Sequence, residues 1–140
     1  MTAVGFSLLS VLAGIIGVVV VVRYFRQARA ARDERLEGRA ERTLHQIYAS
    51  HFADSGIPER RFTALWMQVA EILELPAGRL LPSDRFRGEL SPPKGFEFND
   101  PINDVLYIVS RECQKAGANP DTVGTLHDYI MAVGRGSGRS

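Results

Sequence analysis

The side chains that could carry acid–base, nucleophilic or metal chemistry are few and scattered in this chain of 140 residues. His45 and His51 are six residues apart, which is wrong for two metal ligands on one helical face, and no cysteine or acid completes a set. His127 and Asp128 are adjacent, so on a helix they point about 100° apart and form no dyad by themselves. Cys113 is the only cysteine, and its helical spacing is typical of a small core residue. We therefore expect no catalytic residues, no metal site and no cofactor, and predict that the protein is not an enzyme.

The element that positions the rest of the chain is an uncharged run of twenty residues, from Ala3 to Val22. A hydrocarbon core about 30 Å thick needs roughly 20 apolar residues of helix to cross it. The run is longer than the apolar part of a secretory signal peptide and ends in β-branched residues followed by Arg23, which is a poor cleavage site. The sequence therefore predicts an uncleaved transmembrane anchor over residues 1–22.

A basic segment follows the anchor, with seven arginines and four acids between Arg23 and Leu44. Basic residues near a span stay on the cytoplasmic side. We expect a single-pass protein with its N-terminus outside and its C-terminal domain in the cytoplasm, and a bacterial inner membrane is the expected location. The residues expected to contact lipid headgroups are Arg23, Arg26 and Arg29.

Small residues recur at intervals of four within the anchor. Such spacing allows a second helix to approach closely, which leaves a homo-oligomer open. The helix-packing candidates are Ser10, Ala13, Gly14 and Gly17.

The stretch from Gly5 to Leu9, GFSLL, resembles the processing site of type IV pilins. In that family a glutamate follows the site, whereas this chain has Ser10, and no basic leader precedes Gly5. A pilin-like assembly subunit is therefore an alternative that lacks the residue required for assembly.

Apolar spacing divides the remaining chain into helices. Residues 23–57 are predicted to form an Arg-rich juxtamembrane helix, either continuous with the anchor or bent near Gly38, and a linker. Residues 58–133 are predicted to form an all-α domain, because apolar residues recur three or four apart and no alternating strand is present. We expect Phe96 and Phe98 to pack against its core, Thr122 to cap its last helix, and residues 134–140 to be a flexible tail.

This domain resembles an acyl carrier protein from about Arg61 to Val133, roughly half of the chain. The resemblance rests on three features: a first helix that ends in an apolar pair, a loop LPSDRF, and a last helix TVGTLHDYI. These are residues 72–73, 81–86 and 122–130. It implies a small helical bundle in which a serine at the start of the second helix carries a phosphopantetheine arm.

The chain departs from that family at the serine itself, since Pro101 occupies its position and has no hydroxyl. The resemblance therefore implies an arm-less domain. A membrane-tethered acyl or peptidyl carrier modified at an atypical serine, Ser91 or Ser110, stays open as an alternative.

In carrier proteins the second helix is the usual docking surface for partners. Here Asp104, Tyr107 and Arg111 would lie on one exposed side of that helix, with Ile108 beside them. The same pattern is equally typical of an ordinary solvated face. Residues 58–133 carry eight basic and eleven acidic side chains, which does not favour nucleic-acid binding. We predict a membrane-anchored scaffold that binds a cytoplasmic or membrane protein, through Asp104, Tyr107, Ile108 and Arg111.

Overall fold

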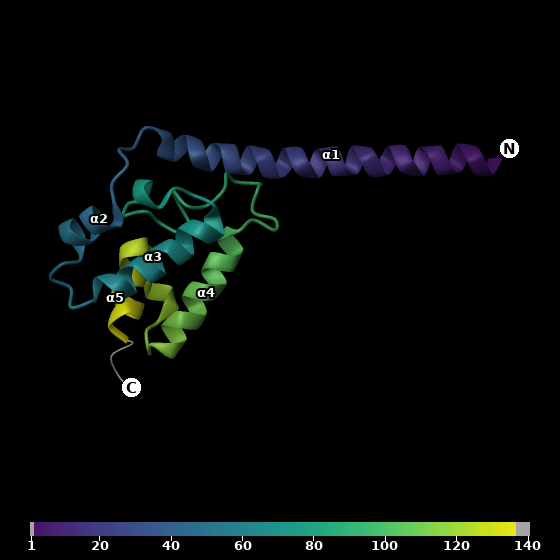
Figure 1. Cartoon of the computed structure of the whole chain (residues 1–140). Helices are drawn as coiled ribbons and strands as arrows, with labels where there is room; N and C mark the ends of the chain where they lie inside the picture. The colour runs from purple at the N-terminus through teal and green to yellow at the C-terminus, as the bar shows by residue number, and fades with distance from the viewer. Residues whose placement is uncertain (1, 137–140) are drawn as a thin grey trace.

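The computed structural model describes the backbone of residues 2–136 and the side chains of residues 7–135. Across this range the only bridge between extended segments is an isolated one between Arg85 and Thr125, so the predicted all-α class is confirmed. A long helix runs along one edge, and the other helices gather under its C-terminal half (Figure 1). The α-helices are α1 (Thr2–Glu37), α2 (Leu44–His51), α3 (Glu59–Leu73), α4 (Ile102–Lys115) and α5 (Leu126–Gly136), with 3-10 turns η1 (Ala77–Arg79) and η2 (Pro120–Thr122).

Helix α1 has two halves with opposite surroundings. Every side chain from position 7 to position 22 is exposed, and the helix is long and apolar enough to cross a membrane: its most apolar 18-residue window has a mean hydropathy of 2.4. In the second half Ala28, Arg32 and Leu36 are buried, four residues apart along one face. The expected continuation of the helix past Arg23 is confirmed, and one helix contains both the apolar run and part of the bundle.

The connection after α1 is a break near Gly38, followed by a capped short helix. Thr43 caps α2: its hydroxyl accepts a hydrogen bond from the Gln46 N–H, and the Gln46 side chain accepts one from the Thr43 N–H. Ile47 of α2 and Phe52 just beyond it are fully buried. Residues 23–57, predicted as a juxtamembrane helix and linker before the domain, therefore contribute side chains to the core.

The core lies where α3 packs against α4 and α5. An aromatic cluster joins α2 to α3, because the Phe62 ring lies 4.9 Å from the Phe52 ring and 5.2 Å from the Trp66 ring, centroid to centroid. Trp66 is fully buried, and its indole N–H donates to the Ala77 carbonyl at 2.9 Å. Cys113 is also buried in this core.

The C-terminal helix differs from the prediction at both ends. Thr125, not Thr122, caps it: the Thr125 hydroxyl accepts from the Asp128 N–H, and the Asp128 carboxylate accepts from the Thr125 N–H, both at 3.1 Å. Thr122 lies in η2 instead. The helix also continues to Gly136, so residues 134–136 of the expected tail are helical, whereas residues 137–140 lie outside the described part of the chain.

The expected burial of Phe98 is wrong, and that of Phe96 is only partial. The Phe98 side chain is 81% exposed. Phe96 is half-buried, and its ring stacks on the ring of Tyr24 in α1 at 4.8 Å instead of entering the main core. Proline and glycine in residues 92–95 prevent regular structure here. The loop packs against α1 through Phe96 and leaves Phe98 exposed.

Candidate functional site

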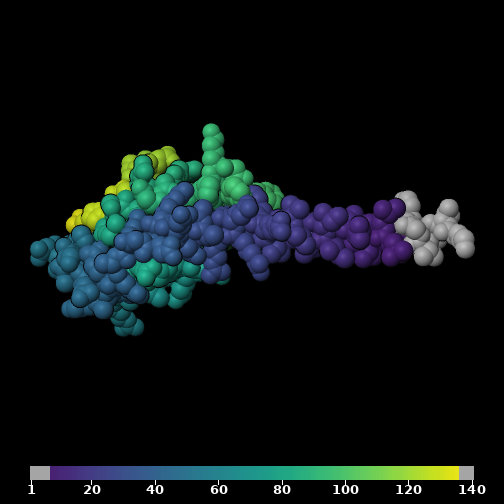
Figure 2. Space-filling model, turned by 90° about the horizontal axis from the view of Figure 1, so that it is seen from above, coloured from purple at the N-terminus to yellow at the C-terminus, as the bar shows by residue number. Residues whose placement is uncertain are grey.

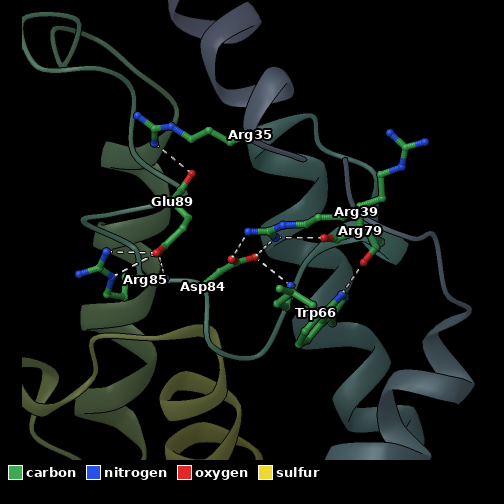
Figure 3. A network of polar contacts seen from close by, with 9 residues as sticks. Arg35, Arg39, Trp66, Arg79, Asp84, Arg85 and Glu89 are labelled. Atoms are coloured by element: carbon green, nitrogen blue, oxygen red, sulfur yellow. Dashed lines mark hydrogen bonds and ion pairs between the residues drawn. The ribbon is translucent and has the colours of Figure 1, made fainter. Parts of the chain in front are cut away.

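The site with the most specific geometry is the contact between the second half of α1 and the segment of residues 80–101, which connects η1 to α4. This segment has no regular helix, so its carbonyl groups need other donors. Arg35 supplies one: its Nη1 lies 3.0 Å from the Gly88 carbonyl oxygen and 2.9 Å from that of Ser91. Figure 3 shows Arg35 reaching from α1 toward Glu89, whose carbonyl oxygen is 3.3 Å away.

Arg32 lies one helical turn earlier and is buried. Its Nε donates to the Leu90 carbonyl at 3.0 Å, and its Nη2 forms an ion pair with the Asp100 carboxylate. The same carboxylate oxygen accepts the N–H of Ile102, the first residue of α4, at 2.9 Å. A carboxylate just before α4 is also favourable at the positive end of the helix dipole. The structure shows that Asp100 joins α4 to α1 as well.

Arg39 forms a second charged contact just beyond the end of α1. Its two terminal nitrogens each lie 2.8 Å from an oxygen of Asp84, in the two-pronged geometry that suits guanidinium and carboxylate (Figure 3). The hydrogen bond with Asp84 raises the pKa of Arg39. Asp84 also accepts the Leu81 N–H at 2.8 Å, so one buried carboxylate fixes both the turn at residues 81–84 and the end of α1.

A more exposed pair organises the turn between these two contacts. The Glu89 carboxylate accepts hydrogen bonds from the Arg85 side chain and from its backbone N–H, the latter at 2.9 Å. These bonds lower the pKa of Glu89 to about 2. The turn that presents its carbonyl groups to Arg35 is therefore itself held by a charged hydrogen bond.

Tyr24 makes the contact closest to the apolar run. Its hydroxyl donates to the Gly95 carbonyl at 3.3 Å and accepts the N–H of Phe98 at 3.1 Å. Together with the stacking on Phe96, these bonds attach residues 95–98 to α1. Tyr24 lies two residues beyond Val22, so the loop meets α1 at the end of the apolar run.

The predicted headgroup contacts divide into two groups. Arg23 and Arg26 are exposed. Arg29 is exposed as well, and its Nη1 lies 2.8 Å from the carboxylate of Glu74. Each of the three guanidinium groups therefore reaches solvent at the end of the apolar run.

The packing candidates all lie on the exposed half of α1. Ser10, Ala13, Gly14 and Gly17 each face outward from the helix. A Cβ added at Gly14 or Gly17 would meet no atom within 4 Å. This stripe has room for a neighbouring helix.

Pro101 lies directly before α4 and is half-buried. It lines a cavity of about 210 Å³ between α1 and the bundle, together with Phe25, Arg26, Leu73 and Glu74 among others. Pro101 therefore faces α1.

The two alternative serines have different surroundings. The Ser91 hydroxyl donates to the Phe86 carbonyl at 2.5 Å, which ties it to its own turn. Ser110 is half-buried and lines a hollow of about 500 Å³ with Arg85, Arg87 and Leu106 among others.

The proposed docking face of α4 is exposed along one line. Asp104 and Arg111 are exposed, and Tyr107 between them is 66% exposed. The Arg111 guanidinium carbon lies 5.9 Å from the centroid of the Tyr107 ring, within the range of a cation–π contact. Ile108 is half-buried on the flank.

Reasoning from the sequence missed three buried or half-buried residues that form ion pairs between the bundle and α1 or the turn that follows it: Arg32, Arg39 and Asp84. A signal was present, because Ala28, Arg32 and Leu36 share a helical face, and an arginine between two buried apolar positions needs a carboxylate partner.

In the described part of the chain, no three His, Cys, Asp or Glu side chains lie close enough to hold a metal ion. Comparison of the chain with family models, with curated proteins and with solved structures found no match.

Proposed function

We propose that this protein is a single-pass membrane-anchored binding module without enzymatic activity, which holds an arm-less, acyl-carrier-like bundle at the cytoplasmic face of a bilayer for a protein partner. The observation that carries the proposal is the division of α1. One continuous helix is apolar and exposed over residues 7–22, yet contributes Arg32 and Leu36 to the interior of the bundle.

The exposed half of α1 supports the anchor. A contiguous apolar surface of this size is unfavourable in water, and a bilayer removes it from water while the helix satisfies its own backbone hydrogen bonds. The arginines that follow favour a cytoplasmic bundle. Since α1 enters the core, the bundle has one orientation relative to the span instead of hanging from a flexible linker.

The exposed side of α4 is the surface we propose for the partner. Tyr107 is a large apolar side chain left uncovered, beside Arg111 and Asp104, and tyrosine and arginine are enriched among the residues that dominate binding energies. In Figure 1 α4 runs from the neighbourhood of α1 away from it, which gives a partner access to this face from the cytoplasm. A partner for this face needs an apolar pocket surrounded by a complementary polar rim.

A photo-crosslinking amino acid in place of Tyr107, with a matched substitution at exposed Arg60 on α3, tests the proposal in native membranes. We expect a discrete protein adduct from position 107 and none from position 60. An adduct of twice the chain mass would identify a second copy as the partner. Equal, diffuse labelling at both positions would contradict a docking face on α4.

Intact-mass analysis distinguishes the proposed binding module from the two alternatives, a modified carrier and a pilin-like subunit. A mass gain after coexpression with a phosphopantetheinyl transferase would show a carrier and contradict the arm-less module. A mature N-terminus at Phe6 would show a processed, pilin-like subunit. We expect neither change, since Pro101 offers no hydroxyl nucleophile and the apolar run is proposed to remain as an uncleaved anchor.

A further inference from the structure

Phe98 is unusual among the large apolar side chains of the bundle. Outside the apolar run of α1, it and Tyr107 are the two large hydrophobic residues most exposed in the described part of the chain, and Phe98 is 81% exposed. A phenylalanine has no polar atom that water could satisfy, so its exposure is unfavourable unless an apolar environment covers it. Its surroundings in the fold indicate what that environment is.

The loop that carries Phe98 is fixed at one level of α1. Tyr24 accepts the Phe98 N–H at 3.1 Å and donates to the Gly95 carbonyl, and it stacks on Phe96. Tyr24 lies only two residues beyond Val22, the last residue of the apolar run, which is about 3 Å along the helix axis. In Figures 1 and 2 the green part of the chain reaches α1 where the bundle ends and the free part of the helix begins.

This level corresponds to the headgroup layer of a bilayer that α1 crosses. The apolar run matches the thickness of the hydrocarbon core, and the headgroup layers add several ångströms on each side. Aromatic side chains are enriched at this depth, and lysine and arginine contact the phosphates there. The exposed residues around Phe98 have this composition: Lys94 in the loop, and Arg23 and Arg26 on α1.

The loop backbone is shaped to keep Phe98 outward. Gly95 and Asn99, on either side of it, have positive φ angles of 94° and 52°. The Glu97 carboxylate accepts the Gly95 N–H at 2.9 Å, which places the one acid of the loop in an internal hydrogen bond. The turn is thus closed on itself, and the Phe98 ring is left on its surface.

We infer that the Phe98 side chain inserts into the interface of the same bilayer that α1 spans, and that residues 92–98 form a second membrane contact of the bundle. The inference rests on the span in the proposed function. Two contacts, one through α1 and one through this loop, fix the rotation of the bundle about α1. They keep the loop at the membrane and leave the distal part of α4 in the cytoplasm.

Tryptophan fluorescence with the full chain in lipid vesicles tests this inference. The variants are Phe98→Trp, Tyr107→Trp as an exposed control outside the loop, and Val20→Trp as a marker of the span. Trp66 is fully buried and gives the same background in each variant. The vesicles contain phosphatidylglycerol and phosphatidylcholine, the latter either unmodified or brominated near the top of its acyl chains, where it quenches nearby tryptophans.

We expect brominated lipid to quench the added fluorescence of Phe98→Trp and Val20→Trp severalfold, and to leave that of Tyr107→Trp unchanged. Quenching of Val20→Trp without quenching of Phe98→Trp would overturn the loop contact and leave the anchor intact. Absence of quenching in both would overturn the span and the loop contact together. Equal quenching of Phe98→Trp and Tyr107→Trp would contradict the orientation and overturn the inference.

Discussion

Arg32 in α1 and Asp100 before α4 form an ion pair in which both side chains are only 3% exposed. The two residues are far apart in the sequence, and Asp100 also holds the first N–H of α4. Each remaining polar atom of such a pair must be satisfied, because a buried charge without a partner is costly. This contact makes the membrane helix part of the folded bundle.

Arg32→Met should lower the free energy of unfolding by about 3–5 kcal/mol, because it leaves the Asp100 carboxylate buried without its cation. The matched control is Arg29→Met, which removes the pair with Glu74, in which the side chains are 59% and 62% exposed. An exposed pair of this kind contributes about 0–1 kcal/mol. Denaturant unfolding in detergent, followed by Trp66 fluorescence, measures both, and equal losses would contradict a special role for Arg32.

Gly78→Ala should be destabilising by about 1–3 kcal/mol, the usual cost of forcing an extra methyl into a packed site. A Cβ at this position would overlap the backbone carbonyl of Arg42, while the Gly78 carbonyl accepts the Arg42 N–H at 3.0 Å. Gly38→Ala is the control, since a Cβ there meets no atom within 4 Å. The melting temperature should fall for Gly78→Ala and change little for Gly38→Ala. The reverse order would show that residues 38–43 do not pack on η1.

Stability should depend on pH through Glu89. Its pKa in the folded protein is about 2, below the ordinary 4.5, chiefly because of the hydrogen bond from the Arg85 side chain. A depressed carboxyl pKa contributes stability that is fully present above about pH 4.5 and is lost as the pH falls toward 2. Glu89→Gln should therefore cost about 1 kcal/mol near pH 6, after allowance for solvent screening of this partly exposed pair.

The difference between Glu89→Gln and the wild type should shrink as the pH is lowered from about 6 to about 3, when Glu89 of the unfolded chain becomes protonated. Denaturant titrations at several pH values measure it. Glu71→Gln, at an exposed position of α3, serves as the control for loss of an acidic side chain outside this turn. A pH-independent difference for Glu89→Gln would contradict the assigned hydrogen bonds.

The Cys113 thiol should be unreactive in the folded protein. It is fully buried, and burial raises its pKa, which lowers the fraction of reactive thiolate. Maleimide labelling should be slow in native conditions and fast after unfolding. The control is a cysteine at exposed Lys115 in a Cys113→Ala background, which should label at once. Rapid native labelling of Cys113 would show that α4 does not pack in the core as described.

The apolar run, the all-α class and the main stripes were predictable from the sequence, because burial repeats every three or four residues along α3 and α4. Trp66 and Cys113 lay on those stripes and are indeed buried. These features are local, so the spacing of neighbouring residues is sufficient to reveal them. A bend near Gly38 was one of two expectations, but α1 ends at Glu37 and residues 38–43 lie outside any helix.

The packing of α1 against the bundle could not be predicted, because it depends on contacts between residues far apart in the chain. Arg32 finds Asp100, and Tyr24 finds a loop more than seventy residues away. From the sequence alone an arginine series after a span fits a lipid contact as well as an internal one. Phe98 was misplaced for the same reason: its exposure follows from the attachment of its loop to Tyr24 and not from its own hydrophobicity.

The central claim is that the span and the bundle share α1 as one rigid element, and a distance measurement across the joint tests it most directly. Spin labels at Val20 and Gln114, both exposed, would be placed in a Cys113→Ala background of the full chain in lipid nanodiscs. We expect a single narrow distance distribution by pulsed electron paramagnetic resonance, which broadens in Arg32→Met. A broad distance distribution in the protein with Arg32 intact, of the kind given by a flexible linker, would contradict the account.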